Sequence, residues 1–295
     1  MNCFINIATG NTIICTGNAF SEKYSLLYMR NTIGRTLTII LAATAIISAC
    51  NRHAGSDELR LQTLSDSGLY ICYANSSFGA DTFCVKRSYT MAWPKNAPDE
   101  LKREIIRLAF GDSTANFNRA SDNFLEDLML FDDDTLTRSI RVDEFNADAD
   151  WMSYMHVSSE CTNDSGLYCF HIAYENYMRY AAHGMYGSHY VTYDTDNKRI
   201  VRLCDLVDTS KLEPVIQKAI EDLPVNGDVL CNVYGPDIPM TDNFFIDSTR
   251  KCIMLVYQPY DIASYANGIQ TVVLPIDWLS KQIELTPYAK EIFGI

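Results

Sequence analysis

The chain has 295 residues, of which 47% are hydrophobic and 21% charged, and these proportions exclude an intrinsically disordered chain. Its 24 Lys and Arg against 37 Asp and Glu give a net charge of −13 and a pI near 4.7. Binding to nucleic acid and adhesion to anionic lipid both need a basic surface, so neither is expected. The length allows one large domain or two small ones.

An apolar run at residues 36–49 follows Arg30 and Arg35 and ends directly before Cys50. A membrane-spanning helix needs about 20 apolar residues, so this shorter run instead has the charge and length of a signal-peptide core. The segment Ile47-Ser48-Ala49-Cys50 resembles a bacterial lipobox, in which the cysteine thiol takes a diacylglycerol. We therefore expect lipidation of Cys50, and stable membrane anchoring without a transmembrane helix.

The lipobox predicts a lipoprotein of the bacterial cell envelope, held at the outer membrane and facing the periplasm or the cell surface. Residues 1–49 are expected to be an upstream extension and the signal peptide. Met29 makes a better start than Met1, so residues 1–28 are expected to come from an upstream start codon, with a genuine short extension as the alternative. The polar residues 50–66 are expected to form the lipidated cysteine and a tether.

Seven cysteines follow Cys50, in a compartment where thiols are oxidised. Cys72 and Cys84 flank a turn-like stretch, as do Cys161 and Cys169, so each pair is a candidate disulfide across a hairpin. Buried free thiols are the alternative. An odd number leaves at least one thiol free or paired between chains. No Cys or His spacing is typical of zinc, and we expect neither a metal nor a cofactor.

The first part of the folded chain, residues 67–149, is expected to form an α+β subdomain. Strands are expected at 69–73 and 82–93, and helices at 98–111 and 114–131. Pro98 and the acids after it favour the first helix start, and Gly111 favours its end. The acidic triplet at 132–134 lacks the spacing and the glycine of an EF-hand loop and is expected to be solvated.

The second part, residues 150–295, is expected to form a C-terminal α+β domain. Strands are expected at 151–160, 167–179, 187–194, 200–203, 244–246, 252–257 and 269–274. Asp208 or Thr209 is expected to cap a helix that extends to Leu223. Since strands and helices come in clumps, the sequence predicts an α+β fold with mostly antiparallel sheets, packed helices and two consecutive subdomains.

Two stretches of this second part carry dense motifs. In 174–208, a tyrosine-rich strand leads into Ala181-Ala182-His183-Gly184, and Asp-Leu-Val precedes a helix. In 243–279, residues 257–268 read YQPYDIASYANG. Together they resemble the RsiV-like extracellular domain family, known from a lysozyme-sensing anti-sigma factor and shared with a peptidoglycan deacetylase and uncharacterised envelope lipoproteins. The family has glycines where this chain has Ala181 and Ala182, and alanine would be strained if that turn needs a positive φ.

The two motifs supply the candidate ligand contacts, which are His183, Tyr186, Tyr260, Asp261 and Tyr265. Tyrosine offers a large amphipathic contact area and is enriched at binding hot spots. The alternative is that the tyrosines cover a sheet face, and that Tyr260 and Tyr265 pack a tight connection.

These features predict a non-catalytic, lipid-anchored envelope binding protein. The resemblance implies a basic protein of the lysozyme type as partner, with a cell-wall glycan as the second candidate. The acidic chain would steer a cationic lysozyme toward itself. Two other functions stay open. A cell-wall hydrolase would bring His183 and Asp261 into one pocket, and a structural accessory subunit would expose a large apolar patch.

Overall fold

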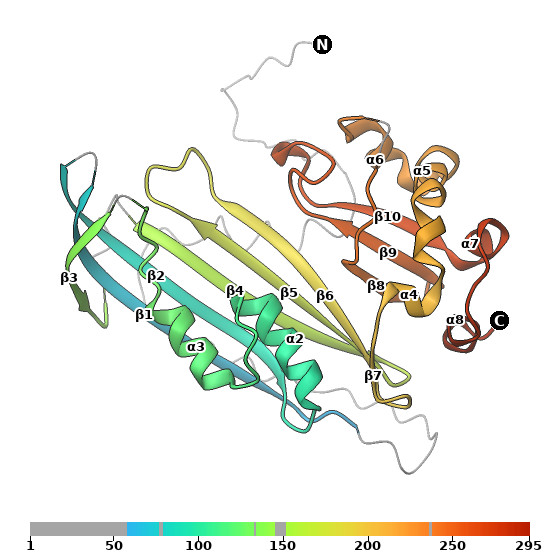
Figure 1. Cartoon of the computed structure of the whole chain (residues 1–295), viewed down its shortest axis with the longest axis horizontal. Coiled ribbons are helices and arrows are strands. Elements are labelled where there is room, and N and C mark those ends of the chain that lie inside the picture. The colour runs from blue at the N-terminus through green and yellow to red at the C-terminus, as the bar shows by residue number, and fades with distance from the viewer. Residues whose placement is uncertain (1–57, 77–78, 133, 145–151, 236–237) are drawn as a thin grey trace, which may run out of the picture. The chain divides into compact units, whose positions relative to one another are not determined.

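A computed structural model describes residues 58–295 apart from 77–78, 133, 145–151 and 236–237 (Figure 1). Within these residues it contains a seven-stranded sheet, a three-stranded sheet and seven α-helices. The α+β class and the mostly antiparallel pairing predicted from the sequence are therefore confirmed. Cys50 and the expected signal peptide lie outside the described residues. No helix among the described residues is long and apolar enough to cross a membrane.

The larger sheet has the strand order β3-β1-β2-β4-β5-β6-β7. Its strands are β1 (Leu61–Ser76), β2 (Gly79–Pro94), β3 (Thr135–Arg141), β4 (Met152–Asp164), β5 (Leu167–Tyr177), β6 (Met185–Asp194) and β7 (Arg199–Val201). All neighbours are antiparallel except β2 and β4, which run parallel from Cys84 opposite Met152 to Thr90 opposite Ser158. Strands on both sides of the expected boundary at residues 149 and 150 thus belong to one sheet.

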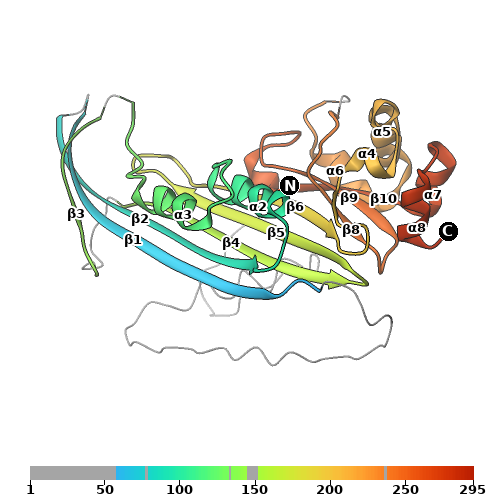
Figure 2. The same cartoon turned by 60° about the horizontal axis from the view of Figure 1, so that its bottom comes forward.

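Two helices, α2 (Asp99–Phe110) and α3 (Phe117–Glu126), cover one face of this sheet (Figure 2). Helix α2 ends as predicted, because Gly111 has a φ of 71° and donates its backbone N–H to the carbonyl of Arg107. Helix α3 is shorter than expected and begins after Asn116, whose side chain accepts from the backbone N–H of Arg119. Phe117 packs at 4.6 Å from Trp93, so the helix is held against β2 by aromatic contact.

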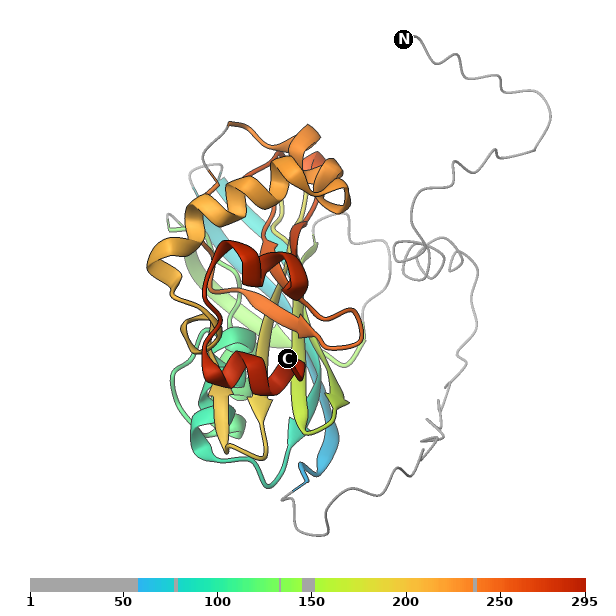
Figure 3. The same cartoon turned by 90° about the vertical axis from the view of Figure 1, so that its right-hand side faces the viewer.

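The C-terminal part builds its own core around the smaller sheet, which has the order β10-β9-β8. Its elements are α4 (Leu203–Leu206), α5 (Leu212–Asp222), α6 (Gly227–Asn232), β8 (Phe244–Asp247), β9 (Cys252–Tyr257), β10 (Gln270–Pro275), α7 (Ile276–Gln282) and α8 (Pro287–Phe293). Helices α5, α7 and α8 contribute to one buried apolar cluster with these strands (Figure 3). Ile216, Ile253 and Leu279 are each fully buried in this cluster.

Two side-chain amides join the smaller sheet to the open edge of β6. Gln258 accepts from the backbone N–H of Ser188 at 2.8 Å and donates to its carbonyl at 2.6 Å. Asn243 accepts from the backbone N–H of Tyr190 at 3.0 Å and donates to the Ser188 carbonyl at 2.8 Å. These amides replace the hydrogen bonds that another strand would make, so the edge of β6 is closed without a continuous sheet.

The acidic triplet is only in part the solvated loop that the sequence predicted, because Asp132 is exposed whereas the side chain of Asp134 is not. The Asp134 carboxylate is fully buried and lies 2.6 Å from the guanidinium of Arg179, which is itself 1% exposed. Asp81 lies 3.2 Å from the same guanidinium, and the ring of Phe83 lies beneath it at 3.5 Å. The buried cation of Arg179 therefore draws Asp134 inside, a long-range pairing that local composition does not reveal.

The two candidate disulfides do not fit the strand register. Cys72 is opposite Phe83 and Cys161 is opposite Phe170, so each cysteine points to the other face of the sheet from its expected partner, Cys84 or Cys169. All seven cysteines of the described chain are free thiols in the structure. Burial raises the pKa of Cys161 to about 12 and that of Cys169 to about 11, which keeps both thiols protonated.

The N-terminal edge also differs from the sequence expectation. Strand β1 begins at Leu61, so the last six residues of the expected tether, 61–66, pair with β2. Strand β3 was not expected at all, and it forms the outer edge of the sheet beside β1.

Candidate functional site

Four of the five candidate contact residues meet in one aromatic cluster. His183 lies in the connection between β5 and β6, and Tyr186 lies on β6, whereas Tyr260 and Tyr265 lie between β9 and β10. The ring of His183 stacks on that of Tyr265 with a centroid distance of 4.1 Å. Tyr265 also meets Tyr186 edge to face at 5.4 Å and Tyr260 at 5.8 Å. We call these four rings the aromatic cluster.

Hydrogen bonds orient the imidazole within the aromatic cluster. His183 Nδ1 lies 2.8 Å from the carbonyl oxygen of Gly184, an acceptor, so Nδ1 carries the proton. Its Nε2 lies 3.3 Å from the hydroxyl of Tyr260. The cluster is therefore ordered by an imidazole that stacks on Tyr265 and is hydrogen-bonded to Tyr260.

The backbone holds Tyr260 in an unusual conformation. Its φ is 76°, in the left-handed region, and its side chain is 50% exposed. The turn is fixed by the backbone N–H of Tyr260, which donates to the carbonyl of Ala263 at 3.1 Å, and by that of Asp261, which donates to Gln258. Tyr260 is thus half exposed, while its ring also contacts that of Tyr265 in the same connection.

The structure also shows which residue of the turn before His183 has a positive φ. Tyr180, with a φ of 66°, is the left-handed residue here, and neither Ala181 nor Ala182 is. The two alanines therefore carry no positive-φ strain. A true glycine requirement lies at Gly268, where φ is 71° and an added Cβ would come 3.1 Å from the hydroxyl of Tyr186.

The fifth candidate, Asp261, lies beside the aromatic cluster but is held separately. Its carboxylate accepts from the backbone N–H of Gln258 at 2.7 Å, and its side chain is exposed. His183 is exposed too and is bound to Gly184 and Tyr260 instead. Neither residue lines either of the two hollows described below. Among the residues that the structure describes, no three His, Cys, Asp or Glu side chains gather as metal ligands.

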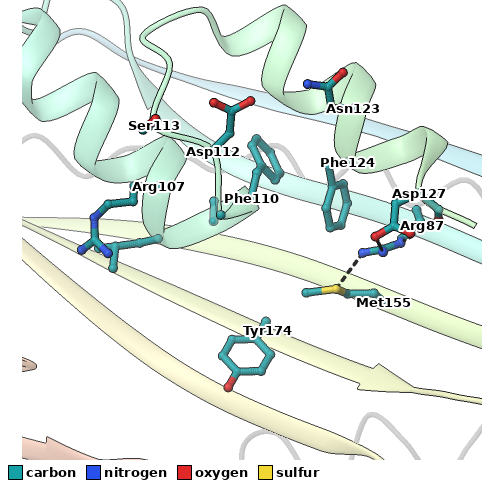
Figure 4. A pocket seen from close by; sticks show the side chains of 13 residues that line it. Arg87, Arg107, Phe110, Asp112, Ser113, Asn123, Phe124, Asp127, Met155 and Tyr174 are labelled. Carbon is teal, nitrogen blue, oxygen red and sulfur yellow. Dashed lines mark hydrogen bonds and ion pairs between the residues drawn. The ribbon is translucent and has the colours of Figure 1, made fainter. Parts of the chain in front are cut away.

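A cleft that the sequence did not reveal lies along α2, with α3 and β5 at one end and β6, β7 and Phe244 at the other. It consists of a hollow of about 670 Å³ around Tyr174 and Asn123 (Figure 4) and a second of about 450 Å³ around His189. Both hollows are lined by Arg107 and Leu108 of α2, so they adjoin. The one sequence signal was Arg87, a charged residue at an inward position of β2 between buried Val85 and Tyr89.

Residues 206–277 match the family model described as "Protein of unknown function (DUF3298)". This segment is therefore similar to DUF3298 domains. It includes Tyr260, Asp261 and Tyr265, whereas His183 and Tyr186 precede it. A comparison with curated proteins finds no match.

Two solved structures of DUF3298 family proteins resemble this chain. The one from Bacteroides fragilis is 18% identical with a TM-score of 0.55, and covers 80% of this chain and 99% of its own. The one from Pseudomonas aeruginosa PAO1 is 15% identical with a TM-score of 0.50, and covers 79% of this chain and 97% of its own. At these identities the likeness shows a shared fold, which extends well beyond residues 206–277.

Proposed function

We propose that this protein is a non-catalytic, lipid-anchored binding protein of the bacterial envelope, and that the aromatic cluster is its contact surface. The observation that carries the proposal is the meeting of His183 and Tyr186 with Tyr260 and Tyr265, which come from segments more than 70 residues apart. A purely structural cluster would be buried, whereas half of Tyr260 is exposed.

The arrangement suits binding because it is ordered before a ligand arrives. Stacked rings and the hydrogen bond between Tyr260 and His183 restrict the side chains, so little conformational entropy remains to be lost on association. Tyrosines of this kind present a large amphipathic area and are common among the residues that dominate binding energy.

As ligand we propose a basic protein of the lysozyme type. The resemblance to the RsiV-like extracellular domain supports this choice, and so does the net charge of −13, which would speed encounter with a cationic partner. The side chain of Asp261, exposed next to Tyr260, would meet a basic group at the edge of the contact.

Anchoring is part of the same proposal. The lipobox ending in Cys50 supports attachment through lipid at the envelope, with the domain facing the periplasm or the surface. Only the residues between Cys50 and Leu61, where β1 begins, would then separate the lipid from the sheet. Such an anchor would place the binding domain close to the membrane.

The test is calorimetric titration of a c-type lysozyme into the full chain, purified in a mild detergent, at 0.15 M salt. A saturable one-to-one complex is expected, and Tyr260→Ala and Tyr265→Ala should each weaken it at least tenfold. Leu136→Ala, an exposed residue on the distant edge strand β3, is the control and should bind as the parent does. Following wall lysis in parallel distinguishes an inhibitor from a sensor.

Two results would contradict the proposal. Binding that disappears at 0.15 M salt would be general charge attraction, and unchanged binding by both tyrosine variants would move the contact elsewhere. In either case, retention of the chain on purified cell-wall sacculi, lost in Tyr260→Ala, would point to the glycan alternative.

A further inference from the structure

The cleft beneath α2 has the size and position of a ligand site, and the aromatic cluster does not use it. Its two adjoining hollows, of about 670 and 450 Å³, lie in the size range of small-molecule sites. Tyr174 on β5 and His189 on β6 form a continuous floor, since their rings lie parallel at 6.0 Å. The two hollows therefore share one floor.

The two arginines that line the larger hollow are already paired. The guanidinium of Arg87 forms an ion pair with Asp127, donates to its carbonyl at 3.1 Å and lies over the ring of Phe124. Arg107 is paired with Glu104 through two hydrogen bonds of 2.7 and 3.0 Å. A free anion would have to displace a carboxylate from one of these arginines, so the lining favours a ligand without net charge.

The walls alternate rings with polar groups, as Figure 4 shows. Phe110, Phe124 and Tyr174 supply aromatic surface, while Ser113 and Asn123 supply a hydroxyl and an amide. The Asn123 amide is exposed at the rim and, within the described part of the chain, is bound to no other residue. These amide and hydroxyl groups offer both donors and acceptors to a ligand.

The ring of Tyr174 lies across β6 because residue 187 is glycine. A Cβ at Gly187 would come 2.5 Å from Cε1 of Tyr174 and 2.6 Å from Oε1 of Gln258. The glycine therefore lets a half-exposed ring lie along the floor of the cleft instead of standing away from the sheet.

We propose that this cleft binds a neutral oligosaccharide. A sugar ring has C–H faces, which pack on the electron-rich faces of aromatic rings, and hydroxyl edges, which pair with amides, hydroxyls and carboxylates. The cleft has both surfaces side by side, and the two arginines of its larger hollow are each paired with a carboxylate. A fatty acyl chain would leave the polar rim unpaired, and a phosphorylated ligand would face Asp112 and Asp127. The proposal does not depend on the partner of the aromatic cluster.

The probe is chitotetraose, a soluble tetramer with hydroxyl and acetamido groups, titrated into the full chain in mild detergent and read by calorimetry and ligand-detected NMR. Saturable binding is expected. Asn123→Ala, exposed on α3, and Tyr174→Phe, which keeps the ring and removes the hydroxyl, should each weaken it at least threefold. Asn118→Ala, exposed on the same helix outside the cleft, should bind within twofold of the parent.

The outcomes separate this site from the aromatic cluster. Tyr260→Ala should leave chitotetraose binding unchanged, and Asn123→Ala should leave lysozyme binding unchanged. The proposal is overturned if chitotetraose fails to saturate the chain, if both cleft variants bind it as the parent does, or if inorganic phosphate competes for it.

Discussion

At the scale of single residues, the left-handed backbone conformation of Tyr260 lowers the stability of the fold while it exposes the ring to solvent. A non-glycine residue in this region is less stable than glycine by roughly 1 kcal/mol. Tyr260→Gly should therefore unfold at a higher urea concentration than Tyr260→Ala, although both lack the ring. Equal or reversed midpoints in urea titrations would show that the turn costs nothing, and the argument from strain to presentation would fail.

Arg179, in the connection between β5 and β6, is the residue that joins β2 to the Asp134 segment. Replacing it with methionine leaves the buried carboxylate of Asp134 without its cation, and removal of one partner from a buried pair costs about 3–5 kcal/mol. Urea unfolding should show this loss for Arg179→Met and partial recovery when Asp134→Asn is added. Arg103→Met, exposed on α2, is the control and should change stability by less than about 0.5 kcal/mol.

At the scale of elements, the open edge of β6 is stabilised by the side-chain amides of Gln258 and Asn243. Asn243→Ala leaves the N–H of Tyr190 and one bond to the Ser188 carbonyl unmade, and an unsatisfied buried polar group costs about 1–3 kcal/mol. Thermal unfolding should detect this loss, whereas Asn118→Ala, exposed on α3, should unfold with the parent. If both variants melt together, water replaces the amide and the edge is not closed by it.

The sequence predicted most of these elements because their signals are local. Alternating apolar residues mark β5, a short continuous apolar run marks β9, and Gly111 marks the end of α2. Strand β3 gave no such signal, since its side chains are almost all exposed and only its pairing with β1 makes it a strand. The parallel pairing of β2 with β4 was equally invisible, because register between distant strands leaves no local pattern.

The aromatic cluster and the cleft also differ in how far the sequence could predict them. The aromatic cluster was anticipated because each half lies in one dense motif, and only the meeting of the halves needed the structure. The cleft could not be anticipated, since Arg87, Asn123 and Tyr174 come from three separate elements, and Arg87 and Asn123 belong to neither motif. Arg87 was the one local signal of the cleft. A charged residue at an inward position of a strand predicts a buried partner but does not identify that partner.

At the scale of the whole molecule, one sheet spans both expected subdomains, so the described chain should unfold as one unit. Trp93 reports on the core beneath α2 and α3, and Trp278 reports on the C-terminal core. We consider one variant that keeps only Trp93 and one that keeps only Trp278. In each variant, the urea midpoint measured by fluorescence should equal the urea midpoint measured by far-UV circular dichroism. Fluorescence and dichroism midpoints that separate would indicate two independent domains.

The same sheet should make the molecule less stable in mild acid. Burial lowers the pKa of His171, and burial together with Arg107 lowers that of His189. Both histidines are then neutral in the folded chain but take a proton in the unfolded chain below about pH 6.5. Unfolding thus becomes more favourable as pH falls from 7.5 to 5.5, above the range where carboxylates titrate. Urea midpoints should fall over this interval, and the fall should be smaller in His189→Gln but unchanged in Asn118→Ala. A midpoint that is constant between the two pH values would mean that both rings accept protons as readily in the folded chain as in the unfolded one.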